Sequence, residues 1–193
     1  MDRPTIICID GTIGSGKSTL IQSLRRYYTC FTEPVEQWTL LSKLYEDPQR
    51  YAAPFQYQVM LTQHDQYSMF KHNKGIVVVE RCPWTSKNVF VELMDKCGYF
   101  KPSTLEAYNE LYNTLGYEVD HYIYLKIDPN QAMDRVKVRD RFAERDIDYG
   151  YLEALNEQYN MTLTRLNKVH IINASETPKQ VEDAVLSIIR TIT

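Results

Sequence analysis

The sequence lacks an excess of positive charge and any long apolar run. Its 193 residues include 22 lysines and arginines against 25 aspartates and glutamates, a formal net charge of −3. The broad basic surface of a general nucleic-acid-binding protein is therefore not expected. No apolar run approaches the roughly 20 residues that span a bilayer, so no membrane partner is expected. A predicted strand beginning at Thr5 leaves no room for a signal peptide, which predicts a cytoplasmic protein.

Metal-binding and disulfide patterns are also missing. The four cysteines form no C-x-x-C pair and are expected to be reduced thiols, as in an intracellular protein. The four histidines show neither H-E-x-x-H nor Cys/His spacing, which argues against a zinc site. Hydrophobic residues at 44% and charged residues at 24% are ordinary for a globular protein, and the length predicts one domain over residues 1–193.

The most informative motif that is present is a glycine-rich loop. It matches the phosphate-binding pattern G-x-x-x-x-G-K-[ST] in full, as Gly11-Thr12-Ile13-Gly14-Ser15-Gly16-Lys17-Ser18-Thr19. An apolar, β-branched run precedes it and helically spaced apolar residues follow it. The loop amides and the helix N-terminus would cradle phosphates, Lys17 would reach the β- and γ-phosphates, and Ser18 would hold Mg²⁺. A chance Gly/Ser turn is the alternative.

Strands alternate with helical segments along the chain. This alternation predicts an α/β fold, a five-stranded parallel sheet with helices on both faces. The predicted strands are Thr5–Ile9, Thr29–Phe31, Ile76–Val79, Tyr122–Ile127 and Val169–Ile172. Two helices are expected between Glu36 and Asn73. Other helix starts are predicted at Asp128-Pro129, at a capping box over Ser103–Glu106, and at Thr177-Pro178, which would open a helix over Lys179–Ile192.

Polar residues stand directly after several of these strands, where ligands of open parallel sheets bind. Glu33 follows the second strand, and a carboxylate there suits a general base, although a loop carboxylate is the alternative. Glu80-Arg81 follows the third strand. Glu80 would ligate Mg²⁺ and Arg81 would contact the transferring phosphoryl group, unless the two form only a structural ion pair. Asn173–Ser175 follows the fifth strand.

Two further clusters have a functional and a structural interpretation. Arg135, Arg139, Arg141 and Arg145 form a basic run that would close over a triphosphate as a lid over about residues 135–148. Interleaved acidic residues make a solvated helix face the alternative. Several aromatics would line a pocket for a planar base, or serve only as core: Trp38, Tyr45, Tyr51, Phe55, Tyr57 and Phe90.

Together these motifs resemble the deoxyribonucleoside kinase family, which includes deoxycytidine, deoxyguanosine, mitochondrial thymidine and insect multisubstrate kinases. The resemblance runs from about Ile7 to Tyr151. Its markers are the phosphate loop, Glu33-Pro34-Val35 with Trp38, Tyr45-Glu46-Asp47-Pro48, Phe55-Gln56, Glu80-Arg81 and the group Arg135, Arg139, Arg141 and Glu144. It implies a P-loop NTPase fold, a homodimer, and Mg²⁺-dependent transfer of the ATP γ-phosphoryl group to the 5′-hydroxyl of a deoxynucleoside in nucleotide salvage.

The resemblance also implies roles for single residues. Glu33 would be the base, with Arg81 its partner, while Lys17 and the lid arginines would stabilise phosphoryl charge. Ser18 and Glu80 would serve Mg²⁺. The remaining implied contacts are Tyr45 and Glu144 on the sugar 3′-hydroxyl, Gln56 on the base edge, Phe90 stacked on the base, Trp38 and Phe55 in the substrate pocket, and Asn173, Ala174 and Ser175 near the adenine of ATP.

The chain departs from the family pattern at five positions. Asp10 and Thr12 replace the usual Glu and Asn beside the first glycine of the loop, and Cys82 replaces a Ser. Gln63 and Ser86 stand where members that favour deoxycytidine or purines carry an Arg and an Asp. Thymidine-preferring members also lack that charged pair, so we expect a pyrimidine preference, with thymidine first. A purine preference is the alternative, because Gln63 could hydrogen-bond a purine.

Two other functions compete with this one. A thymidylate-type monophosphate kinase would need a further cationic group near Glu33, and no arginine occurs between Phe31 and Lys43. A non-catalytic nucleotide switch would be expected to read guanine with N-K-x-D, but Asn167-Lys168-Val169-His170 lacks the aspartate.

Overall fold

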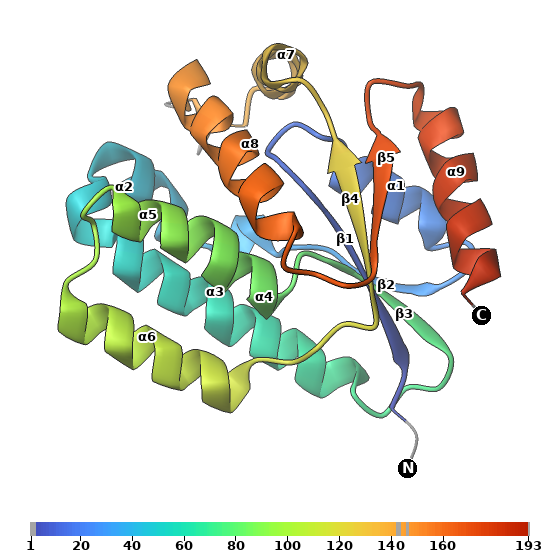
Figure 1. Ribbon diagram of the computed structural model, residues 1–193, viewed down its shortest axis with the longest axis horizontal. Coiled ribbons are helices and arrows are strands. Elements are labelled where there is room, and N and C mark those ends of the chain that lie inside the picture. Colours follow the sequence, from blue (N-terminus) through green and yellow to red (C-terminus); the bar gives the residue numbers. More distant parts are fainter. Residues whose placement is uncertain (1–2, 142–143, 146, 193) are drawn as a thin grey trace.

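The centre of the molecule is a parallel sheet (Figure 1). The computed structural model describes residues 3–141, 144–145 and 147–192. The strand order is β2-β3-β1-β4-β5, and every described pairing is parallel. The strands are β1 (Thr5–Gly11), β2 (Thr29–Phe31), β3 (Ile76–Glu80), β4 (His121–Lys126) and β5 (Val169–Asn173). The five predicted strands and the predicted fold class are confirmed, with small shifts at the strand ends.

Helices cover both faces of this sheet. Among them α1 and α9 lie on one face, and α8 and the end of α3 lie on the other, with α6 outside α3 (Figure 1). The described helices are α1 (Lys17–Leu24), a 3₁₀ turn η1 (Val35–Gln37), α2 (Leu41–Glu46), α3 (Pro48–Phe70), α4 (Pro83–Thr85), the π-helix η2 (Ser86–Val91), α5 (Glu92–Lys96), α6 (Pro102–Leu115), α7 (Pro129–Arg139), α8 (Tyr149–Leu163) and α9 (Pro178–Thr191). None of the helices within the described ranges has the length and apolar character needed to cross a membrane.

Helix caps explain two of the three predicted helix starts. The side chain of Asp128 accepts a hydrogen bond from the Asn130 amide at 2.8 Å, and Thr177 forms a reciprocal capping box with Gln180. The capping box predicted over Ser103–Glu106 is wrong. Proline fixes the φ that the first helical residue needs, so α6 already begins at Pro102 and its N-cap makes no side-chain hydrogen bond.

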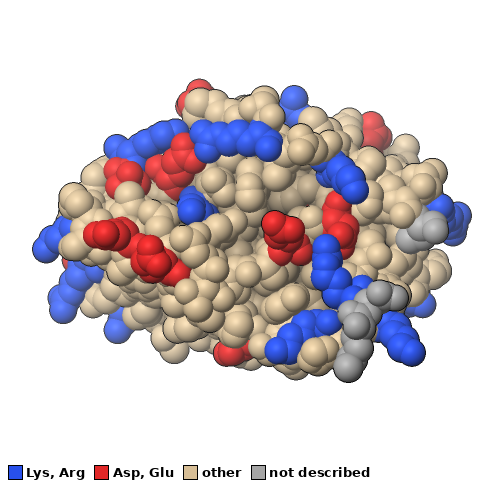
Figure 2. All heavy atoms as spheres, turned by 60° about the horizontal axis from the view of Figure 1, so that its bottom comes forward, with Lys and Arg blue, Asp and Glu red and all other residues tan. Residues whose placement is uncertain are grey.

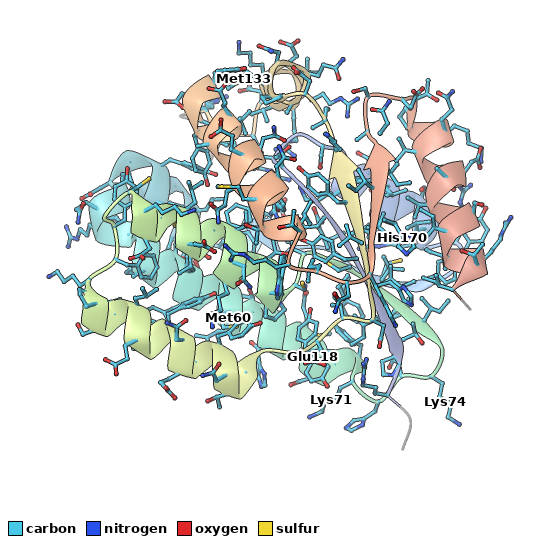
Figure 3. All side chains as sticks on the ribbon, viewed as in Figure 1. Met60, Lys71, Lys74, Glu118, Met133 and His170 are labelled. Atoms are coloured by element: carbon cyan, nitrogen blue, oxygen red, sulfur yellow. The ribbon has the colours of Figure 1, made fainter. Side chains whose placement is uncertain are left out.

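The core is divided by the alternation of side chains along the strands. Ile7 and Ile9 of β1 pack toward α1 and α9, whereas Ile6 and Cys8 pack with Phe70 on the opposite face. A third cluster fills the space between α2, α3, α5 and α6. Figure 3 labels Met60 in that third cluster, and Met133 of α7 at the end of the molecule where the β-strands terminate. Asp10, two residues after Cys8 on the same strand, is thereby directed to the α8 face of the sheet.

The charges on the surface are mixed in sign. On the face shown in Figure 2, basic and acidic side chains are interspersed around a hollowed, mostly uncharged middle. This arrangement agrees with the near-balanced composition of the chain.

Candidate active site

The glycine loop connects β1 to α1 and adopts a conformation that requires glycine. Gly14 has a φ of 84°, and a Cβ at this position would lie 2.4 Å from the carbonyl oxygen of Ala132 on α7. Gly16, at φ 92°, is the N-cap of α1. The first amides of α1 have no partner within the helix and lie at its positive end, which makes this end suited to bind phosphate.

Lys17 is buried at the start of α1. Its Nζ donates hydrogen bonds to the carbonyl oxygens of Gly11 at 3.1 Å and Thr12 at 3.0 Å. Burial, together with the nearby charge of Arg81, lowers the pKa of Lys17 to about 8. The ammonium group therefore lies against the loop, and Gly11 and Thr12 contact it through their backbone.

Oxygen ligands for a cation meet where β2 and β3 end. The Ser18 hydroxyl donates to Glu80 Oε1 at 2.8 Å, and Glu80 Oε2 accepts from the Glu33 amide at 3.3 Å. Because β2, β3 and β1 are neighbours in the sheet, their carboxyl ends bring these residues together. No group of three His, Cys, Asp or Glu side chains that could hold a metal ion occurs among the described residues. One hydroxyl and one carboxylate nevertheless fit Mg²⁺, which keeps waters and binds substrate phosphates.

Glu33 and Arg81 form a buried ion pair beside the loop. Arg81 Nη1 donates to Glu33 Oε2 at 2.5 Å, and the two side chains are only 9% and 8% exposed. Burial raises the pKa of Glu33, against the opposing charge of Arg81. Burial alone would lower the pKa of Arg81, but the carboxylate of Glu33 and other nearby groups outweigh it and the pKa is raised. The Arg81 guanidinium also lies 4.7 Å from the centre of the Phe90 ring.

A cavity opens in front of this pair and extends under α3. Its lining includes the loop, Glu33, Glu80, Arg81, Ser86, Arg139, Arg141, Glu144 and four of the six predicted aromatics, Trp38, Tyr45, Phe55 and Phe90. The other two, Tyr51 and Tyr57, pack against the helical cluster instead. Met94 and Tyr151 also line the cavity, although no sequence pattern singled them out.

Of the two glutamines predicted to bind substrate, Gln56 lines the cavity. Gln56 is 2% exposed, and its Oε1 has no hydrogen-bond partner among the described residues. Gln63 does not line the cavity. It lies behind Ser86, with Gln63 Nε2 3.0 Å and Oε1 3.2 Å from the Ser86 hydroxyl. Gln63 and Ser86 are neutral and bond each other. Gln56 instead donates from Nε2 to Met94 Sδ at 3.6 Å and leaves its Oε1 available to a ligand.

The predicted lid is partly described. Arg139 and Arg141 both pair with the Glu144 carboxylate, and Arg141 also reaches Glu36 at 3.8 Å. Residues 142, 143 and 146 of the predicted lid lie outside the described residues. Arg139 and Arg141 therefore line the cavity while paired with Glu144.

A second cavity lies on the α9 side of the loop. Gly14, Ser15, Gly16, Thr19, Arg135, Arg139 and Ala174 contribute to its lining. Arg135 donates to the Ala174 carbonyl oxygen at 2.9 Å, Asn173 bonds Glu176, and Ser175 bonds Gln131. Ile13 and Ser18 line the first cavity, so the loop separates the two. The structure thus brings almost all of the predicted site residues to one edge of the sheet.

Known proteins resemble this chain over almost its whole length. A sequence model of the deoxynucleoside kinase family matches residues 7–192. A kinase protein of Invertebrate iridescent virus 6 is 51% identical over 181 residues, covering 92% of this chain and 93% of its own. The thymidine kinase of Ictalurid herpesvirus 1 is 28% identical over 198 residues, covering 95% and 85%.

The solved structures share the fold. Deoxyadenosine kinase from M. mycoides superposes with a TM-score of 0.87 at 23% identity, covering 96% of this chain and 99% of its own. The family match extends over nearly the whole chain, and it includes the phosphate loop and the residues around Glu33 and Arg81. The chain therefore belongs to the deoxynucleoside kinase family and is a phosphotransferase.

Proposed function

We propose that the protein transfers the γ-phosphoryl group of ATP to the 5′-hydroxyl of a pyrimidine deoxynucleoside, with thymidine preferred, in nucleotide salvage. The observation that carries the proposal is the buried Glu33–Arg81 pair, which faces a cavity between the phosphate loop and Gln56, whose Oε1 has no hydrogen-bond partner among the described residues. The 5′-oxygen attacks the γ-phosphorus, its proton passes to Glu33, and the bond to the β-phosphate oxygen breaks with its electrons leaving on ADP.

Cationic groups around the loop support this transfer. Lys17 stands against the loop, Arg81 stands beside Glu33, and Arg139 and Arg141 lie over the cavity. These groups stabilise the negative charge that spreads over the transferred phosphoryl group. Ser18 and Glu80 would hold Mg²⁺, which when bound neutralises charge on the phosphates.

The nucleoside end of the cavity supports a base with a carbonyl in its pairing edge. Gln56 offers one donor and one acceptor, which suits the N3–H and O4 of thymine. An Asp in place of Ser86 would repel O4 and favour an exocyclic amine, whereas the neutral Gln63–Ser86 pair does neither. Tyr45 and Glu144, which line the same cavity, would bind the sugar 3′-hydroxyl, while Trp38, Phe55 and Phe90 would flank the base.

Steady-state phosphorylation assays test the proposal. The acceptors are the four deoxynucleosides and thymidine monophosphate, each with ATP in the presence and absence of Mg²⁺. We expect the highest kcat/KM with thymidine and a loss of activity without Mg²⁺. A purine deoxynucleoside that wins by tenfold would contradict the base preference. Activity on the monophosphate alone would contradict an alcohol acceptor.

We also propose that two copies associate through the helices around residues 55–70 and 89–94. Two large apolar side chains of α3 are exposed in the single chain, Leu61 at 49% and Met69 at 71%. Association through this face of α3 would remove both side chains from water. Analytical ultracentrifugation should give twice the mass of one chain. Replacing both Leu61 and Met69 with Glu should lower the measured mass to that of a single chain. A single-chain mass for the unaltered protein would contradict the dimer.

A further inference from the structure

The proposed reaction gives no role to the buried carboxylate of Asp10. Asp10, near the end of β1, has no exposed surface. Its Oδ1 accepts hydrogen bonds from the Gly11 amide and the Tyr159 hydroxyl, both at 2.7 Å. Its Oδ2 accepts from the hydroxyls of Thr85 and Tyr122. Four donors thus fix the orientation of the Asp10 side chain. In the sequence, Asp10 stood out only as a departure from the family pattern.

These donors come from separate parts of the fold. Tyr122 belongs to β4, Tyr159 to α8 and Thr85 to α4. A charged group inside a protein is costly unless it is fully hydrogen-bonded. An apolar residue would pack on this face of the sheet without needing any of these hydroxyls, so a stabilising role alone gives no reason for a carboxylate here.

The same carboxylate contacts Arg81. Asp10 Oδ1 forms an ion pair with Arg81 Nε at 3.4 Å, without the geometry of a hydrogen bond, and Arg81 Nη2 donates to the Gly11 carbonyl oxygen at 3.3 Å. Arg81 has a φ of 58°, a backbone conformation that residues other than glycine seldom adopt. Its amide donates to the Ile9 carbonyl oxygen at 3.1 Å. The end of β1 therefore holds both the backbone and the side chain of Arg81.

Arg81 thus lies between two carboxylates that differ in what they can do. Glu33 faces the cavity, whereas the oxygens of Asp10 are enclosed by hydroxyls and an amide. When Glu33 accepts the proton of the acceptor alcohol, it loses its negative charge, and its electrostatic attraction to Arg81 weakens. The ion pair between Asp10 and Arg81 does not change during that step.

We propose that Asp10 is a positioning residue that keeps the Arg81 guanidinium aimed at the transferring phosphoryl group after Glu33 has taken up the proton. This inference rests on the proposed function, because it needs Glu33 to act as the base. Tyr122, Tyr159 and Thr85 support it indirectly, since they fix the carboxylate that fixes Arg81.

A double-mutant cycle tests this role against a merely structural one. The variants are Asp10→Asn, Arg81→Gln and the double variant, and each is measured for kcat and for the KM of both substrates. If Asp10 acts through Arg81, Asp10→Asn lowers kcat at least tenfold with KM changed less than threefold. In the Arg81→Gln background the same change then costs less than twofold.

Other results would overturn the inference. If Asp10→Asn lowers kcat by the same factor in both backgrounds, Asp10 acts independently of Arg81. If Asp10→Asn leaves kcat within twofold of the unaltered protein, the carboxylate does not position anything. The matched control is Tyr124→Phe on β4, which removes a buried hydroxyl that has no hydrogen-bond partner in the described part of the chain. It should leave kcat unchanged.

Two design choices keep the test decisive. Should Asp10→Asn fail to fold in a thermal melt, Tyr159→Phe replaces it in the cycle, because this change removes a donor to the oxygen that faces Arg81. The same pattern is expected with a smaller loss in kcat, and equal losses in both backgrounds again overturn the inference. The cycle uses whichever acceptor the unaltered protein phosphorylates fastest. A wrong acceptor therefore contradicts the proposed function, while the cycle decides the role of Asp10.

Discussion

Replacing Glu33 with Gln removes the proposed base while keeping the size of the side chain. Gln cannot take the proton of the acceptor alcohol, and general base catalysis contributes about 10²- to 10⁴-fold in rate. The barrier should rise by about 3–5 kcal/mol, and kcat should fall by that factor. KM for both substrates should change little, because Gln56, Lys17 and the loop remain in place.

The same change weakens the fold by less than it weakens the reaction. The bond from Arg81 to Glu33 is charge-assisted and buried, and such bonds stabilise a protein by about 1.5–3 kcal/mol. Arg81 keeps its contacts with Asp10 and the Gly11 carbonyl oxygen after the change, which places the loss toward the lower end of that range. A thermal melt should therefore show a folded protein with a moderately lower Tm.

The assay measures kcat and kcat/KM against pH, with a neighbouring carboxylate as the control. Burial raises the pKa of Glu33, so the unaltered protein should lose kcat/KM as the pH falls through that raised value. Glu33→Gln should lack this acid limb. Glu36→Gln is the matched control, because the Glu36 side chain is 82% exposed and contacts only the rim arginine Arg141 in the described structure. A Glu33→Gln variant whose kcat stays within threefold of normal would contradict the role of Glu33 as the general base. An equal loss of kcat in Glu36→Gln would contradict it as well.

Three further outcomes are expected. Because the pKa of Lys17 is lowered to about 8 and the phosphate needs the charged amine, kcat/KM for ATP should fall about tenfold per pH unit above pH 8, and a flat profile to pH 10 would contradict this. Ser86→Asp should shift the ratio of kcat/KM for deoxycytidine over thymidine upward by tenfold or more, because a carboxylate beside Gln63 favours an exocyclic amine; Ser103→Asp on α6 is the control, and an unchanged ratio would count against the base contact. Thr177→Ala should lower stability by about 1 kcal/mol, and Tm by about 2–4 °C, with unchanged activity, since it removes the capping box of α9, whereas Thr191→Ala at the other end should have a smaller effect.

Features carried by short stretches of chain were predictable. The apolar run before the glycine loop had to be a buried strand, and parallel strands bring their carboxyl ends to one edge, so Glu33, Glu80 and Arg81 were expected to meet. Their proximity follows from the sheet order, in which β3 lies between β2 and β1.

Features that depend on distant contacts were not predictable. The four hydroxyl and amide donors around Asp10 come from four places in the chain. The sequence around Tyr122 or Tyr159 does not indicate that either side chain donates to Asp10. The pairing of Gln63 with Ser86 similarly joins α3 to η2. One indication of this network is visible in the sequence: Asp10 is a charged residue near the end of a mostly apolar strand, β1. The failed cap at Ser103 shows that a local pattern can also yield to a stronger local constraint, the proline before it.

The contact of Glu144 with both Arg139 and Arg141 turns anion capture into an exchange of counter-ions. An incoming anion must displace a carboxylate that is already in place, so a small monoanion gains little from entering. A triphosphate brings several negative charges at once and can replace the carboxylate with a net gain. If the arginine cluster binds the phosphates as proposed, it would favour a multivalent anion over a monovalent one, and the released Glu144 would remain in the lining of the acceptor cavity.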